Sequence, residues 1–204
     1  MKQVDKSHYQ FQNYMSKARW CSLWHQLDEI LRTEPEKVLE IGQGQGLLKA
    51  IAAQYGIRIE TLDLDPELNP DHIGSATEIP LADSMFDVVC AFQMLEHLPY
   101  DLSLQAFREM ARVCRKHVII SLPDAKHIWR YQFHVPKIGP MDFLIPRPSF
   151  GEQTHKFDGE HYWEINKKGY GLDRVTRDFS SICRLIKTYR VSENPYHRFF
   201  VFEK

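Results

Sequence analysis

The sequence predicts an α/β fold in which helices cover a mostly parallel sheet. Short apolar runs such as Phe86–Phe92 are hydrophobic along their whole length, as expected for parallel strands covered on both faces. Segments with helical spacing alternate with these runs, which is typical of strand–helix–strand units. A glycine-rich loop, Gly42–Gly46, directly follows one of the runs and is typical of a strand-to-helix turn that holds a ligand.

Length and composition fit a single domain over residues 1–204. With 43% hydrophobic and 26% charged residues, the chain resembles an ordinary globular protein. No apolar run is long enough to span a bilayer, and the first residues are too polar for a secretory signal. The four cysteines contain no Cys-x-x-Cys pair. We therefore expect a cytoplasmic protein without a membrane span, a disulfide framework or a cysteine zinc site.

Charge is divided unevenly along the chain. The net charge of −1 argues against general nucleic-acid binding. Residues 1–107 nevertheless hold 8 Lys and Arg against 16 Asp and Glu, whereas residues 108–204 hold 18 against 11. This asymmetry is either a solvated dipole or a basic surrounding for an anionic ligand.

The elements before Pro123 alternate regularly. The pattern predicts, in order, a helix over about 16–32, a strand at 37–41, a helix at 47–55 that ends at Gly56, strands at 58–63 and 86–92, a helix at 103–113 and a strand at 117–122. In the first helix, a stripe at helical spacing is expected in the core; it comprises Trp20, Leu23, Trp24, Leu27, Ile30 and Leu31. Residues 1–36 are expected to form an amino-terminal helical cap.

The segment after Pro123 breaks this alternation. Residues 136–150 carry four prolines and predict an irregular insertion over 125–167, on the substrate side of the sheet. The insertion holds apolar side chains and cations: Ile138, Met141, Phe143, Leu144, Ile145, Phe150, Lys137, Arg147, His155 and Lys156. It is expected either to roof an acceptor pocket or to pack against a second copy of the chain in a homodimer. A helix at about 171–181 and an antiparallel pair of strands at 183–191 and 197–203 complete the chain.

The glycine loop narrows the choice of ligand. The Gly-x-x-x-x-Gly-Lys-Ser/Thr pattern of nucleoside triphosphate sites is absent from the sequence. Gly42 and Gly44 fit the first two glycines of the dinucleotide pattern, but the third glycine is Gly46 rather than position 47. Glu40 precedes the loop, and Asp63 lies at the end of the next strand, where a carboxylate can accept both ribose hydroxyls of an adenosine.

These blocks resemble the class I S-adenosylmethionine-dependent methyltransferases. The resemblance runs through VLEIGQGQG, TLDLDPELNPD, ATEIPLADSMFDVVCAFQMLEHLPY and HVIISLPD, and covers about residues 38–124. The family fold is a Rossmann-like three-layer sandwich with a mostly parallel seven-stranded sheet, whose last strand is antiparallel. The resemblance therefore implies S-adenosyl-L-methionine as cofactor and S-adenosyl-L-homocysteine as product. GEHYWEINKKGY and ENPYHRFFVFEK are similar to the carboxy-terminal part of a prokaryotic branch whose acceptor is unidentified.

The resemblance also implies a role for each matching position. The loop that contains Gly42, Gln43, Gly44 and Gly46 would lie beside the methionine and ribose, and Glu40 would order it. Asp63 would take the ribose hydroxyls, Leu64 would pack on the adenine, and Ser75 and Ala76 would read the adenine edge. Gln93 would flank the methyl sulfonium. In relatives the first helix often closes over the cofactor, so Arg19 is expected to pair with its carboxylate, with Tyr14 nearby.

Three histidine and glutamate residues are candidates for the chemistry. Gln93-x-x-Glu96-His97 is similar to the Glu-x-x-Glu-His of metal-assisted relatives, but the neutral amide of Gln93 is a poor ligand for a hard cation. The sequence therefore predicts no metal, and Glu96 and His97 instead cap a turn or act on the acceptor. His161 is the candidate general base, with Glu160 or Asp158 raising its pKa; alternatively it lies in a surface loop whose Tyr162 and Trp163 pack on the core.

The predicted function is methyl transfer to a small-molecule acceptor with an apolar and an anionic part. Two alternatives stay open. One is a cofactor-binding module without catalysis, whose binding residues would look the same. The other is a nicotinamide-dependent oxidoreductase, which the missing third glycine at position 47 disfavours.

Overall fold

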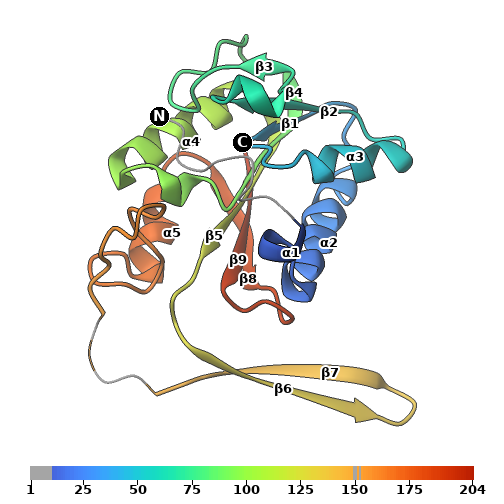
Figure 1. Cartoon of the computed structure of the whole chain (residues 1–204), viewed down its shortest axis with the longest axis vertical. Helices are drawn as coiled ribbons and strands as arrows, with labels where there is room; N and C mark the ends of the chain where they lie inside the picture. Colours follow the sequence, from blue (N-terminus) through green and yellow to red (C-terminus); the bar gives the residue numbers. More distant parts are fainter. Residues whose placement is uncertain (1–10, 149–150, 152) are drawn as a thin grey trace.

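A seven-stranded sheet forms the centre of the molecule in the computed structural model, which describes residues 11–148, 151 and 153–204 (Figure 1). The strand order is β3–β2–β1–β4–β5–β9–β8. The strands are β1 (Val38–Ile41), β2 (Ile59–Asp63), β3 (His72–Ile73), β4 (Phe86–Phe92), β5 (Cys114–Pro123), β8 (Arg184–Arg190) and β9 (His197–Glu203). The first five are parallel, and β9 is antiparallel to both β5 and β8. The predicted three-layer fold is confirmed, including the antiparallel last strand.

Helices cover both faces of this sheet. The helices are α1 (Phe11–Tyr14), α2 (Lys17–Leu31), α3 (Leu47–Gln54), α4 (Tyr100–Val113) and α5 (Leu172–Ser180), with short 3₁₀ turns η2 (Pro66–Leu68) and η3 (Leu95–His97). Figure 1 shows α2 and α3 on one face and α4 and α5 on the other. No helix of the described residues is long and apolar enough to cross a membrane.

Alternate residues of the central strands supply two separate cores. Val88 and Cys90 of β4 face α2 and α3, whereas Val89 and Ala91 face α4 and α5. Because successive strand residues point to opposite faces, a strand between two helical layers must be apolar throughout. Phe86–Phe92 is buried along nearly its whole length, as the sequence predicts.

The expected stripe of the first helix is only partly buried. Leu23, Leu27 and Ile30 are in the core, but Trp20 and Trp24 are 49% and 59% exposed. The prediction that these tryptophans belong to the core is therefore wrong. Helix α2 buries the Leu–Leu–Ile side against the sheet, and the tryptophans one turn apart lie on its outer side. Residues 1–10 of the predicted cap lie outside the described residues.

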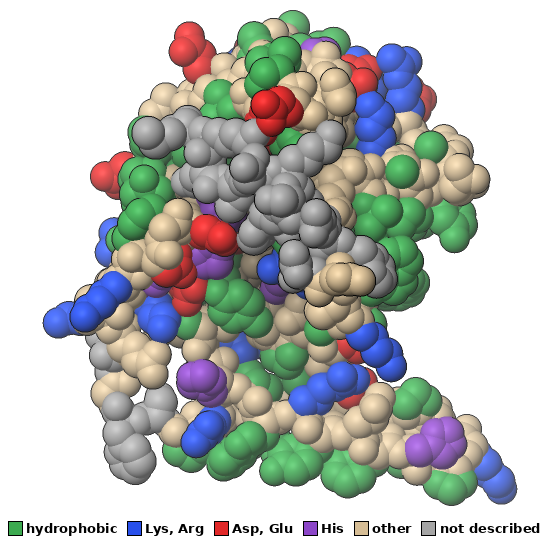
Figure 2. All heavy atoms as spheres, in the orientation of Figure 1, with side chains coloured by type: hydrophobic (Ala, Val, Ile, Leu, Met, Phe, Trp, Pro, Cys, Tyr) green, Lys and Arg blue, Asp and Glu red, His purple; other side chains and the backbone are tan. Residues whose placement is uncertain are grey.

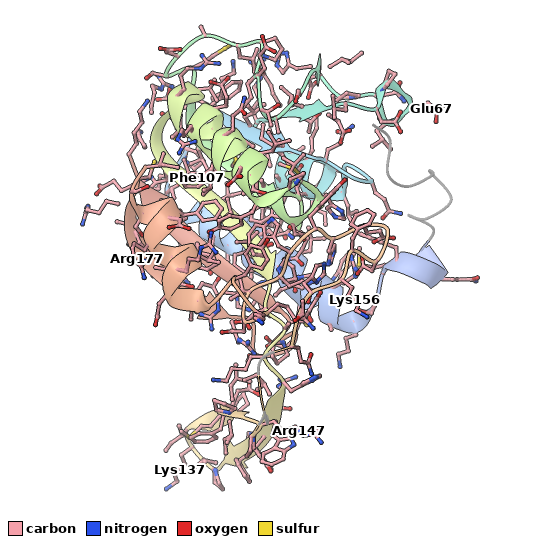
Figure 3. The ribbon with its side chains drawn as sticks, turned by 90° about the vertical axis from the view of Figure 1, so that its left-hand side faces the viewer. Glu67, Phe107, Lys137, Arg147, Lys156 and Arg177 are labelled. Atoms are coloured by element: carbon pink, nitrogen blue, oxygen red, sulfur yellow. The ribbon has the colours of Figure 1, made fainter. Side chains whose placement is uncertain are left out.

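The Pro-rich insertion contains regular structure, which corrects the expectation of an irregular segment over 125–167. Strands β6 (Ile128–Val135) and β7 (Gly139–Pro146) form an antiparallel hairpin, separate from the main sheet. Pro136 lies in the turn, and Pro140 and Pro146 lie near the ends of β7. Both strands of an isolated hairpin are edge strands, where proline is tolerated because its missing N–H is not needed for a hydrogen bond to a neighbouring strand. The hairpin projects from the body (Figure 1), and Lys137 and Arg147 on it lie well below Phe107 of α4 in Figure 3.

Candidate active site

The loop between β1 and α3 brings the backbone into an unusual conformation. Gly42, Gly44 and Gly46 all have positive φ, a region that glycine enters without steric cost. A side chain at Gly42 would also place its Cβ 2.5 Å from Cγ of Met94. Gly46 begins α3 as a left-handed N-cap. The loop therefore leaves an open backbone surface at the carboxyl end of β1.

Two carboxylates flank this loop. Glu40 is buried, and its Oε2 has no hydrogen-bond partner among the described residues. Burial, followed by the charge of Asp63, raises the pKa of Glu40 to about 8. Burial also raises the pKa of Asp63, whereas hydrogen bonds from the backbone N–H groups of Asp65 and Gln43 lower it. Asp63 therefore lies against the glycine loop, as its sequence spacing predicts.

Gln93 follows the carboxyl end of β4. This strand is the neighbour of β1, and the strand order reverses between the two. The φ of Gln93 is +52°, which is rare for a residue with a side chain and stores backbone strain. Its side-chain amide donates to the Ser121 hydroxyl at 3.2 Å, and its backbone N–H donates to the Ser121 carbonyl at 3.0 Å. Neighbouring β5 thus holds Gln93 in place at the carboxyl edge of the sheet.

A pocket opens between these elements and α2. Six of the predicted cofactor residues line it: Arg19, Glu40, Gly42, Gln43, Gly44 and Gln93. Tyr14 also lines the pocket and lies under the Arg19 guanidinium, 4.1 Å from the ring centre. The Gln43 side chain donates to the Leu68 carbonyl at 2.6 Å and joins the glycine loop to the chain after β2. Carboxyl ends of parallel strands at a switch point are where open α/β sheets bind ligands.

Five further predicted cofactor residues do not line this pocket: Gly46, Asp63, Leu64, Ser75 and Ala76. Gly74 donates its N–H to the Asp63 carbonyl at 3.1 Å, which places the Ser75–Ala76 segment beside the end of β2. Ser75 hydrogen-bonds Thr77, and Ala76 is buried in the core. Leu64 is exposed at the strand end.

His197 is a pocket residue that the sequence did not indicate. It is buried and lines the pocket, and within residues 11–148, 151 and 153–204 its Nδ1 has no hydrogen-bond partner. Burial and the charge of Arg19 lower its pKa to about 3, so the imidazole is neutral. Its register partner is Pro123, the last residue of β5. The sequence feature that could have indicated His197 is the predicted antiparallel last strand. The first residue of such a strand lies at the sheet edge where the parallel strands end.

The three candidate catalytic residues lie together. The rings of His97 and His161 are 5.1 Å apart, and the backbone N–H of Tyr162 donates to the Glu96 carbonyl at 2.9 Å. Burial raises the pKa of Glu96 to about 8, and burial together with the nearby His161 lowers the pKa of His97. Trp163 is fully buried beside this segment, as expected, but Tyr162 is exposed.

The charge of Asp158 raises the pKa of His161, as predicted, but the carboxylate that hydrogen-bonds its ring is a different one. Glu164, rather than Glu160 or Asp158, hydrogen-bonds its Nδ1 at 3.0 Å. Burial favours the neutral ring, but the Glu164 bond and the Glu96 and Asp158 charges outweigh it and raise the pKa of His161. The Asp158 carboxylate accepts the backbone N–H groups of Glu160 and His161 instead.

Comparison with known proteins identifies the same region. Residues 39–122, from β1 to β5, match the family model of a methyltransferase domain. No curated protein matches the chain significantly. The PH0226 protein of Pyrococcus horikoshii is similar over 98% of this chain and 99% of its own, with a TM-score of 0.62 and 14% identity.

Two further similar structures are methyltransferases with bound S-adenosylhomocysteine. The glycopeptide N-methyltransferase MtfA has a TM-score of 0.59 and 13% identity, over 93% of this chain and 90% of its own. The 1,6-didemethyltoxoflavin-N1-methyltransferase of Burkholderia thailandensis has a TM-score of 0.59 and 13% identity, over 97% of this chain and 84% of its own. The family match and the shared fold agree with the resemblance seen in the sequence. Residues 39–122 thus match a methyltransferase domain, and the chain as a whole has the fold of these structures.

Proposed function

We propose that the chain binds S-adenosylmethionine in the pocket between β1, β4 and α2 and transfers its methyl group to a small-molecule acceptor. One observation carries this proposal. The left-handed glycine loop lies between Glu40 and Asp63 and faces Gln93 across the switch in strand order. Structures that bind S-adenosylhomocysteine share the fold, which supports the same assignment.

Each side chain then has a defined part in binding. Asp63 accepts hydrogen bonds from the ribose hydroxyls, and exposed Leu64 packs on the adenine, whose edge Ser75 and Ala76 read. Arg19 pairs with the cofactor carboxylate, and Glu40 orders the glycine loop and the amino end. Strained Gln93 flanks the methyl group.

The protein's contribution to the reaction is alignment. The sulfonium of the cofactor supplies an activated methyl group, so the acceptor must be placed in line with it while water is excluded. A base is needed only where the acceptor arrives protonated. Of Glu96, His97 and His161, His161 is the strongest candidate for this base, because Glu164 hydrogen-bonds its ring and raises its pKa.

The acceptor is proposed to carry an apolar and an anionic part. At the root of the hairpin, a cavity of about 310 Å³ is lined by Lys126, Arg190, Arg198, Ile128, Leu144, Pro146, Asn166 and Leu172, and of these only Leu144 belongs to the side chains expected to contact the acceptor. Asp124 pairs with both Arg190 and Arg198, so the two arginines and Lys126 leave a positive balance. Of the predicted insertion cations, Lys137 and Arg147 lie on the hairpin and line neither this cavity nor the cofactor pocket.

Titration calorimetry with S-adenosylhomocysteine and with NAD tests this function against the oxidoreductase alternative. We expect binding of one S-adenosylhomocysteine per chain and no binding of NAD. Binding of NAD alone would overturn the proposal. A chain that binds S-adenosylhomocysteine but uses up no S-adenosylmethionine with any of a panel of small anionic acceptors would favour the silent binding module.

A further inference from the structure

The cavity at the root of the hairpin lies at the same edge of the sheet as the cofactor pocket, on the other face of β9. His197 lines the pocket together with Leu23 of α2, whereas the next residue, Arg198, lines the cavity together with Leu172 of α5. Successive strand residues point to opposite faces, so β9 separates the two spaces. Arg190, the register partner of Arg198, ends β8, which runs parallel to β5. The cavity therefore also opens at the carboxyl edge.

One wall of this cavity is cationic. Its described lining contains three cations, Lys126, Arg190 and Arg198, and neither Asp nor Glu. The only other polar group of this lining is the amide of Asn166. A concave surface lined by charges of one sign concentrates ligands of the opposite sign, so this cavity favours an anion.

The two arginines carry more charge than their carboxylate partner neutralises. Buried Asp124 accepts from Nε of Arg190 at 2.8 Å and from Nε of Arg198 at 2.7 Å, and it also pairs with Nη2 of Arg190. One carboxylate thus faces two guanidinium groups whose side chains are only 5% and 14% exposed. Burial lowers the pKa of Arg190, Asp124 raises it, and the charge of Arg198 lowers it again. A surplus charge in a buried site is unfavourable unless a counter-ion reaches it.

Two cations of this wall keep donors for a ligand. Arg198 donates from Nε to Asp124 and from Nη1 to Thr188, whereas its Nη2 has no hydrogen-bond partner among the residues that the structure describes. The backbone of Lys126 bonds Asp124 and Arg190, but its exposed ammonium has neither a hydrogen bond nor an ion pair with them or with any other described residue. Guanidinium and ammonium donors of this kind bind carboxylate and phosphate oxygens.

The rest of the lining suits an apolar body. Ile128, Leu144 and Pro146 come from the root of the hairpin, and Leu172 begins α5. The volume of about 310 Å³ is at the lower end of the range of small-molecule pockets, roughly 300–1,000 Å³. The cavity is therefore suited to a small organic anion rather than to a lone inorganic ion.

We propose that Arg190, Arg198 and Lys126 bind a carboxylate or phosphate group in this cavity, while the apolar lining holds the body of the same molecule. The proposal rests on the proposed function in one respect, because it takes this anion to be part of the methyl acceptor. An acceptor anchored on Arg198 lies at the same sheet edge as the cofactor, one residue from His197 in the cofactor pocket. Binding of the anion itself can be measured without methyl transfer.

Titration of the full chain at constant ionic strength, followed by the backbone amide signals in nuclear magnetic resonance, tests this site. The probes are hexanoate, hexyl phosphate and, as their neutral counterpart, hexanol. We expect a saturable shift of the Lys126, Asn166 and Arg198 amides with at least one of the two anions, and the tighter one identifies the anionic group. Hexanol should bind at least tenfold more weakly, because it cannot neutralise the surplus charge.

Three variants assign the binding to the cationic wall. Affinity for the tighter anion should fall at least tenfold in Arg198→Gln and about threefold in Lys126→Gln, where an exposed charge is lost. Lys137→Gln removes a cation of the hairpin turn that lines neither space, and it should bind like the parent. Circular dichroism reports whether each variant is folded. Lys126→Gln decides the matter if Arg198→Gln is not, because the Lys126 ammonium has no bond to a described residue to lose.

The proposal would be overturned by the absence of a saturable shift with either anion, or by equally tight binding of hexanol. Unchanged affinity in folded Arg198→Gln, or in Lys126→Gln, would also overturn it. Calorimetry with S-adenosylhomocysteine separates this site from the cofactor pocket. A parent that binds S-adenosylhomocysteine but neither anion refutes this site alone. A parent that binds an anion but no S-adenosylhomocysteine refutes the proposed function, and with it the identification of the anion as part of the methyl acceptor.

Discussion

At the scale of single residues, Glu40 connects stability with binding. The fold buries this carboxylate next to Asp63, and its Oε2 has no hydrogen-bond partner in the part of the chain that the structure describes, so the folded protein holds a proton on it up to a pH of about 8. The same carboxylate is available to a cationic ligand at the glycine loop. Residues in binding sites often destabilise the unliganded protein in this way.

The pH dependence of stability tests this account of Glu40. Its pKa is higher in the folded chain, about 8, than the ordinary value of 4.5. The folded state therefore binds more protons between these values, and the free energy of unfolding of the ligand-free protein should fall as the pH rises from 4.5 to 8. Glu40→Gln should remove part of this fall and be more stable than the parent at pH 8 by roughly 2–4 kcal/mol.

Urea denaturation at pH 5 and pH 8 measures this effect. Exposed Glu36→Gln is the control and should keep the parent's pH dependence. Glu40→Gln should also bind S-adenosylhomocysteine more weakly. An unchanged difference between the two pH values in Glu40→Gln would show that Glu40 is not a buried, perturbed acid.

Asp63 gives a second prediction at this scale. Asp63→Ala removes a charged acceptor from the ribose hydroxyls and should weaken S-adenosylhomocysteine binding by about 2–3 kcal/mol, or roughly 30- to 150-fold. The fold should persist, because the side chain is at a strand end. Calorimetry measures the affinity, with Asp65→Asn as the control for loss of a nearby charge. Unchanged affinity in Asp63→Ala would place the ribose elsewhere.

The sequence could predict some site residues and not others for a physical reason. Glu40, Gly42 and Asp63 belong to short segments whose spacing is set by one strand–helix–strand unit. His97 and His161 come together only through the long return segment after the hairpin, and His197 only through the pairing of β9 with β5. Contacts between segments so distant in sequence leave no local pattern.

At the scale of elements, the hairpin β6–β7 is amphipathic, and its apolar face is exposed among the described residues. Opposed residues of an antiparallel pair share a face, so one face carries Trp129, Tyr131, Phe133, Met141, Phe143 and Ile145. These side chains are all exposed, and Figure 2 shows hydrophobic groups along the projecting arm. The other face holds the Arg130–Asp142 ion pair. The sequence pattern did not predict this hairpin, because its four prolines indicated an irregular segment.

We expect this face to be covered by a second copy of the chain. The exposed fractions of its four aromatic side chains, at ~150–250 Å² per aromatic side chain, give roughly 300–450 Å² per copy, and exposed Met141 and Ile145 add to this area. A standard stable interface buries about 800 Å² per partner. The apolar face of the hairpin would therefore supply a large part of such an interface, in line with the second expectation for the insertion, a homodimer.

Replacing Ile128–Pro146 by a short glycine linker tests this dimer. Arg147 donates its N–H to the His127 carbonyl at 2.9 Å, so the cut ends are already adjacent. Sedimentation should show a dimeric parent and a monomeric deletion that still binds S-adenosylhomocysteine. Arg130→Gln, on the polar face, should remain dimeric. A monomeric parent would contradict the prediction, and a parent that sediments with lipid vesicles would assign the face to a membrane surface.

At the scale of the whole molecule, the order of the sheet explains why one pocket gathers residues from the first helix to the last strand. The strand order reverses between β1 and β4, and the chain leaves both strands at the same edge. Antiparallel β9 returns to this edge at His197. The alternation of apolar runs and helices was sufficient to predict a parallel sheet covered by helices, because its central strands had to be buried on both faces, whereas the seven strands with an antiparallel last strand were implied by the family resemblance. The short β3 has too few residues to show a pattern.

The central claim is that this edge of the sheet holds S-adenosylmethionine. A crystal structure of the full chain with S-adenosylhomocysteine tests it most directly. We expect the ribose hydroxyls within hydrogen-bonding distance of the Asp63 carboxylate, the adenine on Leu64, and the sulfur end beside Gln93. A ligand bound at another edge of the sheet, or one whose ribose faces away from Asp63, would contradict the account.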